Sequence, residues 1–187
     1  MRMRNFGAPL LAGMLLLPLA LMARQNDHND AFMRGPNGEN RLVREVRHQL
    51  LMLPYYSIFD DLAFRVNDTT VTLMGDVTDP VLKSSAENVV KRIEGVTEVN
   101  NEIQVLPVSP MDWQIRRSEY RAIYGDPQIG DRYGHQALAS IHIIVKNGNV
   151  KLEGAVANEG DKNLINIRAN GVPNVFHVQN DLQVVGG

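Results

Sequence analysis

The sequence predicts an α+β protein made of two tandem modules, each with the order helix, strand, strand, helix, strand. Three observations support this fold class: an internal repeat, short alternating apolar stretches that end at turn sequences, and apolar helical stripes with capping residues. Each module is expected to hold one three-stranded sheet packed by two helices. Of the 187 residues, 44% are hydrophobic and 21% are charged, which is typical of a globular chain.

The repeat relates residues 66–106 to residues 145–185 at a constant shift of 79 positions without a gap. Eleven of the 41 aligned pairs are identical, and they fall in two blocks with the same spacing. We therefore interpret residues 41–107 and 111–186 as two copies of one module, joined by a short proline-containing linker.

Alternating apolar residues predict a hairpin in each copy. In the first copy Leu62, Phe64 and Val66 alternate with other residues, and the alternation resumes after a turn. In the second copy the turn contains Asn147 and Gly148, which adopt positive φ at low cost. The last strands are expected at residues 103–106 and 182–185.

Glycine also lies inside the second predicted strand of each copy, at Gly75 and Gly154. Glycine weakens a strand unless another group approaches closely. Either a ligand lies against the backbone there, or a neighbouring helix packs on the sheet, and we favour helix packing.

Four helices are expected. The first helix of each copy covers residues 41–53 and 111–124. In the later helices Asp79 and Asn158 are the expected N-caps, and Pro80 fits the first turn. Gly95 is expected to end the helix of the first copy, and Asn174 takes the equivalent place in the second.

The N-terminus has the layout of a secretion signal at residues 1–23. Arg2 and Arg4 precede an uncharged, leucine-rich run at residues 8–22. A retained N-terminal anchor is the alternative. Removing residues 1–23 leaves 17 basic and 21 acidic residues, a formal charge of −4. This charge does not favour nucleic acid as a partner.

Residues 24–40 are polar and are expected to form a flexible leader. Within them Asp27, His28, Asn29 and Asp30 include possible metal ligands, but a solvated tether is the simpler interpretation.

The strand and turn pattern resembles the BON domain, the bacterial osmotic-shock and nodulation domain. The pattern V-x-L-x-G-x-V, followed by a helix and V-x-x-V-x-N-x-[IL]-x-V, is present at residues 71–77 with 96–105 and again at 150–156 with 175–184. The structural positions of the motif are Gly75, Gly95, Asn101, Gly148, Gly154, Asn174 and Asn180. The second copy departs from the pattern at Asn174, where glycine is usual, and in a longer loop at residues 125–136.

The resemblance implies a periplasmic or outer-envelope location and no enzymatic activity. It also implies attachment to phospholipid membranes or envelope components, and a role in tolerance of osmotic or envelope stress.

The residues themselves predict no catalytic, cofactor or metal site. The chain has no cysteine, and its five histidines form no metal-binding spacing. The positions shared by the two copies are apolar residues, Gly, Asn, Lys or Gln, which hold a fold and perform little chemistry.

One helix carries a candidate membrane-binding face that combines aromatic rings with arginines, a composition that suits a membrane–water interface. Its residues are Trp113, Arg116, Arg117, Tyr120, Arg121 and Tyr124. The competing interpretation places the aromatic rings in the core of the second module and the arginines on a solvated face.

Two hypotheses about function follow from these features. The first is a module that binds anionic phospholipid or an envelope polymer. The second is a structural protein that docks a protein partner or a second copy of itself. An enzyme is the least favoured class.

Overall fold

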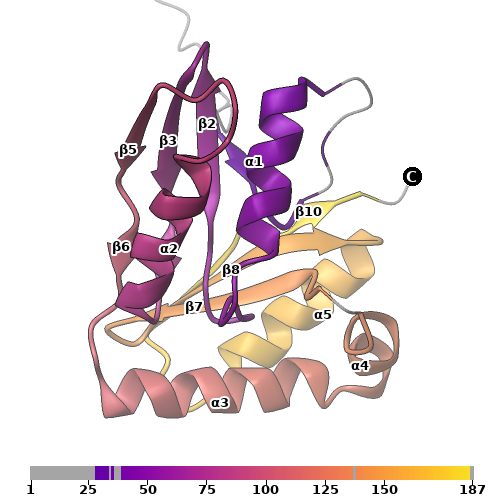
Figure 1. Ribbon diagram of the computed structural model, residues 1–187. Coiled ribbons are helices and arrows are strands. Elements are labelled where there is room, and N and C mark those ends of the chain that lie inside the picture. Colours follow the sequence, from indigo (N-terminus) through magenta and orange to yellow (C-terminus); the bar gives the residue numbers. More distant parts are fainter. Residues whose placement is uncertain (1–27, 34, 36–38, 137, 186–187) are drawn as a thin grey trace, which may run out of the picture.

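The structure, a computed structural model, describes residues 28–33, 35, 39–136 and 138–185 (Figure 1). The expected secretion signal at residues 1–23 lies outside the described residues. In the described part of the chain, no helix combines the length and the apolar character that crossing a membrane requires.

Both modules have the expected order of elements, so the predicted α+β class is confirmed. The first module consists of α1 (Arg41–Leu51), β2 (Ala63–Asn67), β3 (Thr70–Met74), β4 (Asp76–Val77), α2 (Pro80–Val90), β5 (Glu98–Asn101) and β6 (Gln104–Val105). The second consists of α3 (Pro110–Tyr124), α4 (Pro127–Tyr133), β7 (Ile141–Lys146), β8 (Asn149–Val156), α5 (Glu159–Asn170), β9 (His177–Asn180) and β10 (Gln183–Val184).

The two sheets share one topology. In each module the first two strands pair as an antiparallel hairpin, β2 with β3 and β7 with β8. The third strand then pairs parallel to the second, β5 with β3 and β9 with β8. This third strand begins at Glu98 in the first module and at His177 in the second, earlier than the expected starts at residues 103 and 182. The sequence did not reveal the earlier start because the alternating polar residues of the strand leave little apolar signal.

A segment of the expected leader joins the first sheet. Asn29 and Asp30 form β1, which pairs antiparallel with β2 opposite Phe64 and Ala63. Ala31 follows with no exposed surface. The expectation of flexibility is therefore wrong for this stretch, because the edge of β2 supplies hydrogen-bond partners that a sequence pattern does not reveal.

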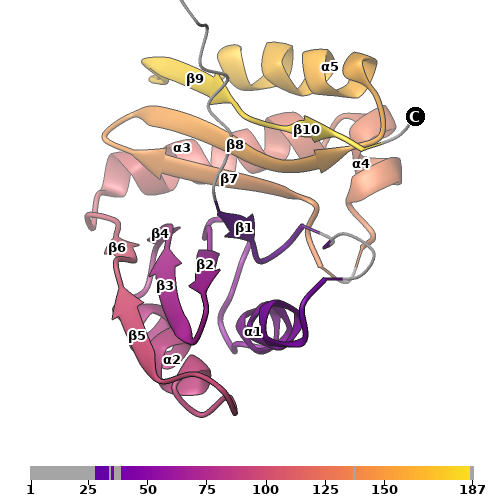
Figure 2. The same cartoon turned by 90° about the horizontal axis from the view of Figure 1, so that it is seen from above.

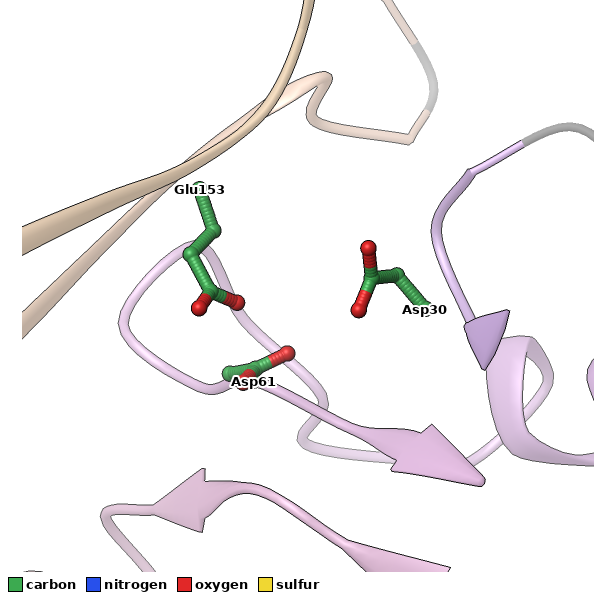
Figure 3. A group of neighbouring side chains, drawn as sticks. All are labelled: Asp30, Asp61 and Glu153. Atoms are coloured by element: carbon green, nitrogen blue, oxygen red, sulfur yellow. The ribbon is translucent and has the colours of Figure 1, made fainter. Parts of the chain in front are cut away.

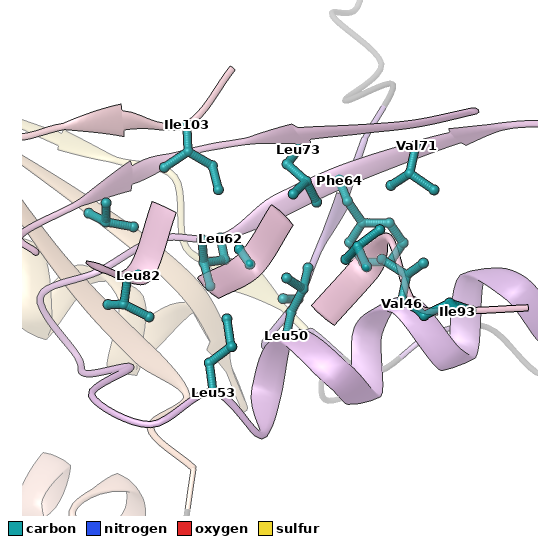
Figure 4. Packing of buried hydrophobic residues seen from close by; sticks show 14 residues of the cluster. Val46, Leu50, Leu53, Leu62, Phe64, Val71, Leu73, Leu82, Ile93 and Ile103 are labelled. Atoms are coloured by element: carbon teal, nitrogen blue, oxygen red, sulfur yellow. The ribbon is translucent and has the colours of Figure 1, made fainter. Parts of the chain in front are cut away.

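Each module has its own hydrophobic core between its sheet and its helices. Figure 4 shows the first core, a single buried cluster that includes Leu50 of α1, Leu82 of α2 and strand residues such as Phe64 and Leu73. The second core is built the same way from α3, α5 and the strands, with Ile123, Ile143 and Leu152 fully buried.

Gly75 and Gly154 serve the close approach of a neighbouring strand. Their φ angles are +115° and +129°, and an added Cβ would lie 2.2 Å from the carbonyl oxygen of Asp61 or 1.9 Å from that of Ser140. Packing rather than a ligand explains both glycines, but the packing partner is the backbone just before β2 or β7 and not the helix that we expected.

The shared asparagines tie the last strand to the preceding helix in both modules. The Asn101 Nδ2 donates to the Lys83 carbonyl at 2.9 Å, and the Asn180 Nδ2 donates to the Lys162 carbonyl at 3.1 Å. Their Oδ1 atoms also accept a backbone N–H two residues further on. The repeated asparagine is therefore a structural hydrogen-bonding residue.

The helix ends differ from the expectation. Helix α2 ends at Val90, and α5 ends at Asn170 before Gly171. Gly95 lies five residues after the end of α2 and Asn174 lies four residues after the end of α5, with φ angles of +97° and +68°, in the turns that lead to β5 and β9. The left-handed conformation expected at both positions is confirmed, but it does not end the helix. The N-caps Asp79 and Asn158 are confirmed.

The region expected as a longer loop at residues 125–136 contains the short helix α4. Asp126 caps its first turn by accepting from the Gln128 and Ile129 backbone N–H groups. The Tyr133 hydroxyl donates to Asp161 at the start of α5, at 2.6 Å. This helix therefore packs the end of α3 against α5.

The two modules contact each other through the loop at residues 57–60, and Figure 2 shows the second sheet lying alongside the first module. The Ile143 N–H donates to the Ile58 carbonyl at 2.7 Å. Ile58 and Phe59 pack against the core of the second module. The modules thus share apolar contacts and backbone hydrogen bonds, in addition to the linker.

Candidate functional site

Helix α3 carries the candidate binding residues and has two chemically different faces. Ser109 caps it by accepting from the Asp112 N–H at 3.1 Å, and Pro110 occupies the first turn. Its buried residues are Asp112, Ile115, Arg116, Glu119 and Ile123. This face packs on the second sheet, so the opposite face of the helix is available for a partner.

Two charged side chains of the buried face fix α3 to the β7–β8 hairpin. The carboxylate of Asp112 accepts the N–H groups of Asn147 at 3.0 Å and Gly148 at 2.9 Å. The guanidinium of Arg116 donates to the Val145 carbonyl at 2.7 Å. Arg116 is 4% exposed, so this residue of the expected binding set is a structural clamp.

The outward face of α3 holds four of the six candidate residues. Trp113 is 50% exposed, Tyr120 is 48% exposed, and Arg117 and Arg121 are also exposed. The spacing i, i+4, i+7 and i+8 places them along one side of a helix. The competing expectation of a core position is therefore wrong for Trp113 and Tyr120.

Tyr124 lies at the boundary between this face and the core. It is half-buried, and its hydroxyl donates to the Ile141 carbonyl at 2.8 Å. Its ring lies 5.2 Å from that of Tyr120. Tyr124 therefore packs against Tyr120 and contributes little exposed surface of its own.

Phe59 adds an aromatic ring that sequence reasoning missed. Its ring meets Trp113 edge to face with the centroids 5.7 Å apart. Together with Ile58 it lines a shallow recess of about 320 Å³ against Arg117, Tyr120 and Arg121. Phe59 belongs to the first module and lies 54 positions before Trp113, so no local spacing could have revealed it.

The surface next to Trp113 is also apolar. Val108 in the linker is fully exposed and Met111 is 50% exposed. Among the described residues neither Arg117 nor Arg121 forms an ion pair, while Glu119, the acid between them, is turned into the core. We call Phe59, Trp113, Arg117, Tyr120 and Arg121 the α3 surface; it joins apolar rings to unpaired positive charge.

Glu119 is itself unusual, because it is fully buried and neither carboxylate oxygen has a hydrogen-bond partner. Burial raises the pKa of Glu119 to about 8. The side chain is therefore largely neutral at neutral pH, which leaves the arginines as the charged groups of α3's exposed face.

His142 is buried at the boundary between the two modules and contacts the backbone of both. Its Nδ1 lies 2.7 Å from the Asp60 carbonyl and its Nε2 lies 3.2 Å from the Ala139 carbonyl. The ring stacks on Phe32 at 4.3 Å between centroids. Burial lowers the pKa of His142. Both ring nitrogens lie against backbone carbonyls, of which the neutral ring can donate to one, and this buried position favours a structural role.

Three carboxylates from distant parts of the sequence meet at the module boundary: Asp30, Asp61 and Glu153 (Figure 3). We expected no metal site, and Asp30 belongs to the segment that we interpreted as a solvated tether. Separations of 31 and 92 positions hide the group from any motif search.

The chain belongs to the BON domain family. The family model matches residues 40–107 and 130–186, which is more than half of the chain and once in each module. The resemblance found in the sequence is thus confirmed, and the chain is a tandem dual-BON protein.

No curated protein matches the chain. Two similar solved structures are of CdsD, a structural protein of the type III secretion system of Chlamydia trachomatis. The first is its C-terminal domain, at 12% identity and a TM-score of 0.28, covering 79% of this chain and 98% of that one. The second has the same identity and TM-score and covers 78% of this chain and 93% of that one.

Proposed function

We propose that the protein is an exported, non-enzymatic envelope protein that binds anionic phospholipid through the α3 surface. The BON domain is a non-enzymatic family. The observation that carries the proposal is the exposed row of Trp113, Arg117, Tyr120 and Arg121 on one helix face. On the basis of the family resemblance, we further propose a periplasmic location and a role in osmotic or envelope stress tolerance.

The chemistry of the α3 surface suits a lipid headgroup region. Indole and phenol rings have an apolar body and a polar edge, and they are favoured where hydrocarbon meets water. Guanidinium groups bind phosphate through paired N–H donors. Phe59 and Met111 extend the apolar area beside the rings, so the apolar part of the surface can enter the headgroup layer while the arginines pair with lipid phosphates.

Vesicle co-sedimentation tests this proposal with a chain of residues 24–187, which retains every described residue. We expect binding to vesicles that contain anionic lipid, weaker binding to neutral vesicles, and a loss of affinity as salt screens the arginines. The Arg117→Gln/Arg121→Gln variant should bind roughly thirtyfold more weakly, because each arginine near an anionic membrane contributes about 1 kcal/mol.

The matched control is Arg44→Gln/Arg92→Gln, which removes two exposed arginines from the first module and changes the net charge equally. This control should retain most of the affinity. Equal losses in the two double variants would contradict a specific role for the α3 surface. Equal binding to neutral and anionic vesicles would contradict the role of charge.

The second candidate function is docking of a protein partner or a second copy of this chain. The observation that favours it is that β5 and β9 are sheet edges with no further neighbouring strand among the described residues. An extended segment can add to such an edge through backbone hydrogen bonds. This function predicts a defined oligomer or complex without lipid, which analytical ultracentrifugation measures.

A further inference from the structure

The carboxylates of Asp30, Asp61 and Glu153 converge from three separate segments. Asp30 lies on β1, Asp61 lies two residues before β2, and Glu153 lies on β8 of the second module (Figure 3). One oxygen from each lies within 4.8 Å of the other two. A single group placed among them would contact the leader segment and both modules.

The cluster is poorly balanced in charge. The ammonium of Lys151 lies 3.7 Å from the Asp61 Oδ2 and also contacts Glu153. His28 is 3.1 Å from Asp30 on the outer side. One lysine against three carboxylates leaves the cluster short of positive charge at a largely buried boundary.

Asp61 gives a second and separate indication that a ligand belongs there. It is only 3% exposed, yet its buried Oδ1 has no hydrogen-bond partner. Figure 3 shows its carboxylate directed toward the other two. Burial, and next the charge of Glu153, raise the pKa of Asp61 well above its ordinary value. Buried polar atoms are rarely left unpaired, so this oxygen is free to bind a ligand, although Lys151 already contacts the other oxygen of the same carboxylate.

We propose that Asp30, Asp61 and Glu153 bind a calcium ion that joins β1 to both modules. Carboxylate oxygens are ligands for hard divalent cations. Calcium–oxygen distances of about 2.3–2.6 Å allow ligand oxygens up to about 5.2 Å apart, and the three carboxylates each bring an oxygen within 4.8 Å of the others, so one calcium ion can contact all three. Calcium is preferred to magnesium because magnesium keeps several of its waters and is rarely held by protein ligands alone. The Lys151 side chain is 30% exposed, so its ammonium can turn to solvent when calcium binds.

Calorimetric titration of the full chain with calcium chloride, after chelator treatment, tests the proposal. We expect one site per chain. The midpoint of thermal unfolding should rise by about 5 °C or more at a hundredfold excess of calcium over the dissociation constant. Magnesium chloride should bind at least about tenfold more weakly.

The variants Asp61→Asn and Glu153→Gln should each weaken calcium binding at least about tenfold and abolish the thermal shift. The control Glu98→Gln removes an exposed acid elsewhere and should bind calcium like the original chain. Absence of calcium binding at millimolar concentration would overturn the proposal. So would calcium binding that both site variants retain, or an affinity for magnesium equal to that for calcium.

Folding of the variants is checked without calcium. Asp61→Asn removes a desolvated charge, so its unfolding midpoint in chelator should equal or exceed that of the original chain. Asp30→Asn provides a further variant outside the hydrophobic core, on the two-residue strand β1. If Asp61→Asn fails to fold, loss of calcium binding in folded Asp30→Asn and Glu153→Gln supports the site, and retention of binding in both overturns it.

Discussion

The first helices of the two modules, α1 and α3, occupy equivalent positions, but their buried faces differ in chemistry. In α1 the buried residues are Val46, Leu50 and a single charged residue, Arg47, whose guanidinium donates to the Met33 carbonyl and to Glu39. In α3 the equivalent face buries Asp112, Arg116 and Glu119 between its isoleucines. The comparison teaches that a repeated fold fixes the position of a helix and leaves open whether apolar contact or hydrogen bonding to the hairpin holds it.

The difference also explains why the outward faces diverge. Since Asp112 and Arg116 anchor α3 through the backbone of residues 145–148, the helix keeps its orientation while Trp113 and Tyr120 remain exposed. Helix α1 carries no such aromatic row. The second module therefore presents the proposed binding surface, while the first contributes Phe59 to it.

The largest expected effect comes from placing a buried acid in α1. Val46→Glu puts a carboxylate in an apolar core without a partner, so we expect a loss of about 4 kcal/mol or more in the free energy of unfolding. Urea denaturation measures this loss. His48→Glu, at an exposed position of the same helix, is the control and should change stability by less than about 0.5 kcal/mol. Similar losses in both variants would contradict the comparison.

Removing the Asp112 carboxylate, which fixes α3 to the β7–β8 hairpin, should have a smaller effect on stability. Asp112→Asn replaces an acceptor of two backbone N–H groups by an amide with one acceptor oxygen. We therefore expect a loss of about 2 kcal/mol. Urea denaturation measures it, and Asp131→Asn on the exposed side of α4 is the control. An unchanged stability of Asp112→Asn would show that the hairpin does not need this carboxylate.

The smallest expected effect is a gain in stability from Glu119→Gln. The pKa of Glu119 is about 8 in the folded chain and about 4.5 when unfolded. Between these values the folded state holds a proton that the unfolded state has released, so its contribution to stability falls as pH rises through this window. The variant should be about 1–2 kcal/mol more stable than the original chain at pH 8, with less difference near pH 4. Thermal unfolding at both pH values measures the difference, and a gain that does not depend on pH would contradict the titration of Glu119.

Much of the fold was predictable because its signals are local and repeated. The Asn147–Gly148 turn, the Asp79 and Asn158 caps and the left-handed Asn174 each depend on the preferences of a few adjacent residues. The candidate face of α3 was predictable in part, since helical spacing placed its aromatic residues on one side. Spacing could not decide which side meets the sheet, and this is why Arg116 was assigned to the wrong role.

By itself the sequence determined the two modules, their order of elements and the family to which the chain belongs. Only the tertiary structure decided that Phe59 completes the α3 surface, that β1 joins the first sheet and that Asp30, Asp61 and Glu153 meet. The physical reason is the separation along the sequence of the residues that interact. Hydrogen-bonded turns and caps involve neighbours within a few residues, whereas these three features bring together segments that lie more than 30 positions apart in the sequence.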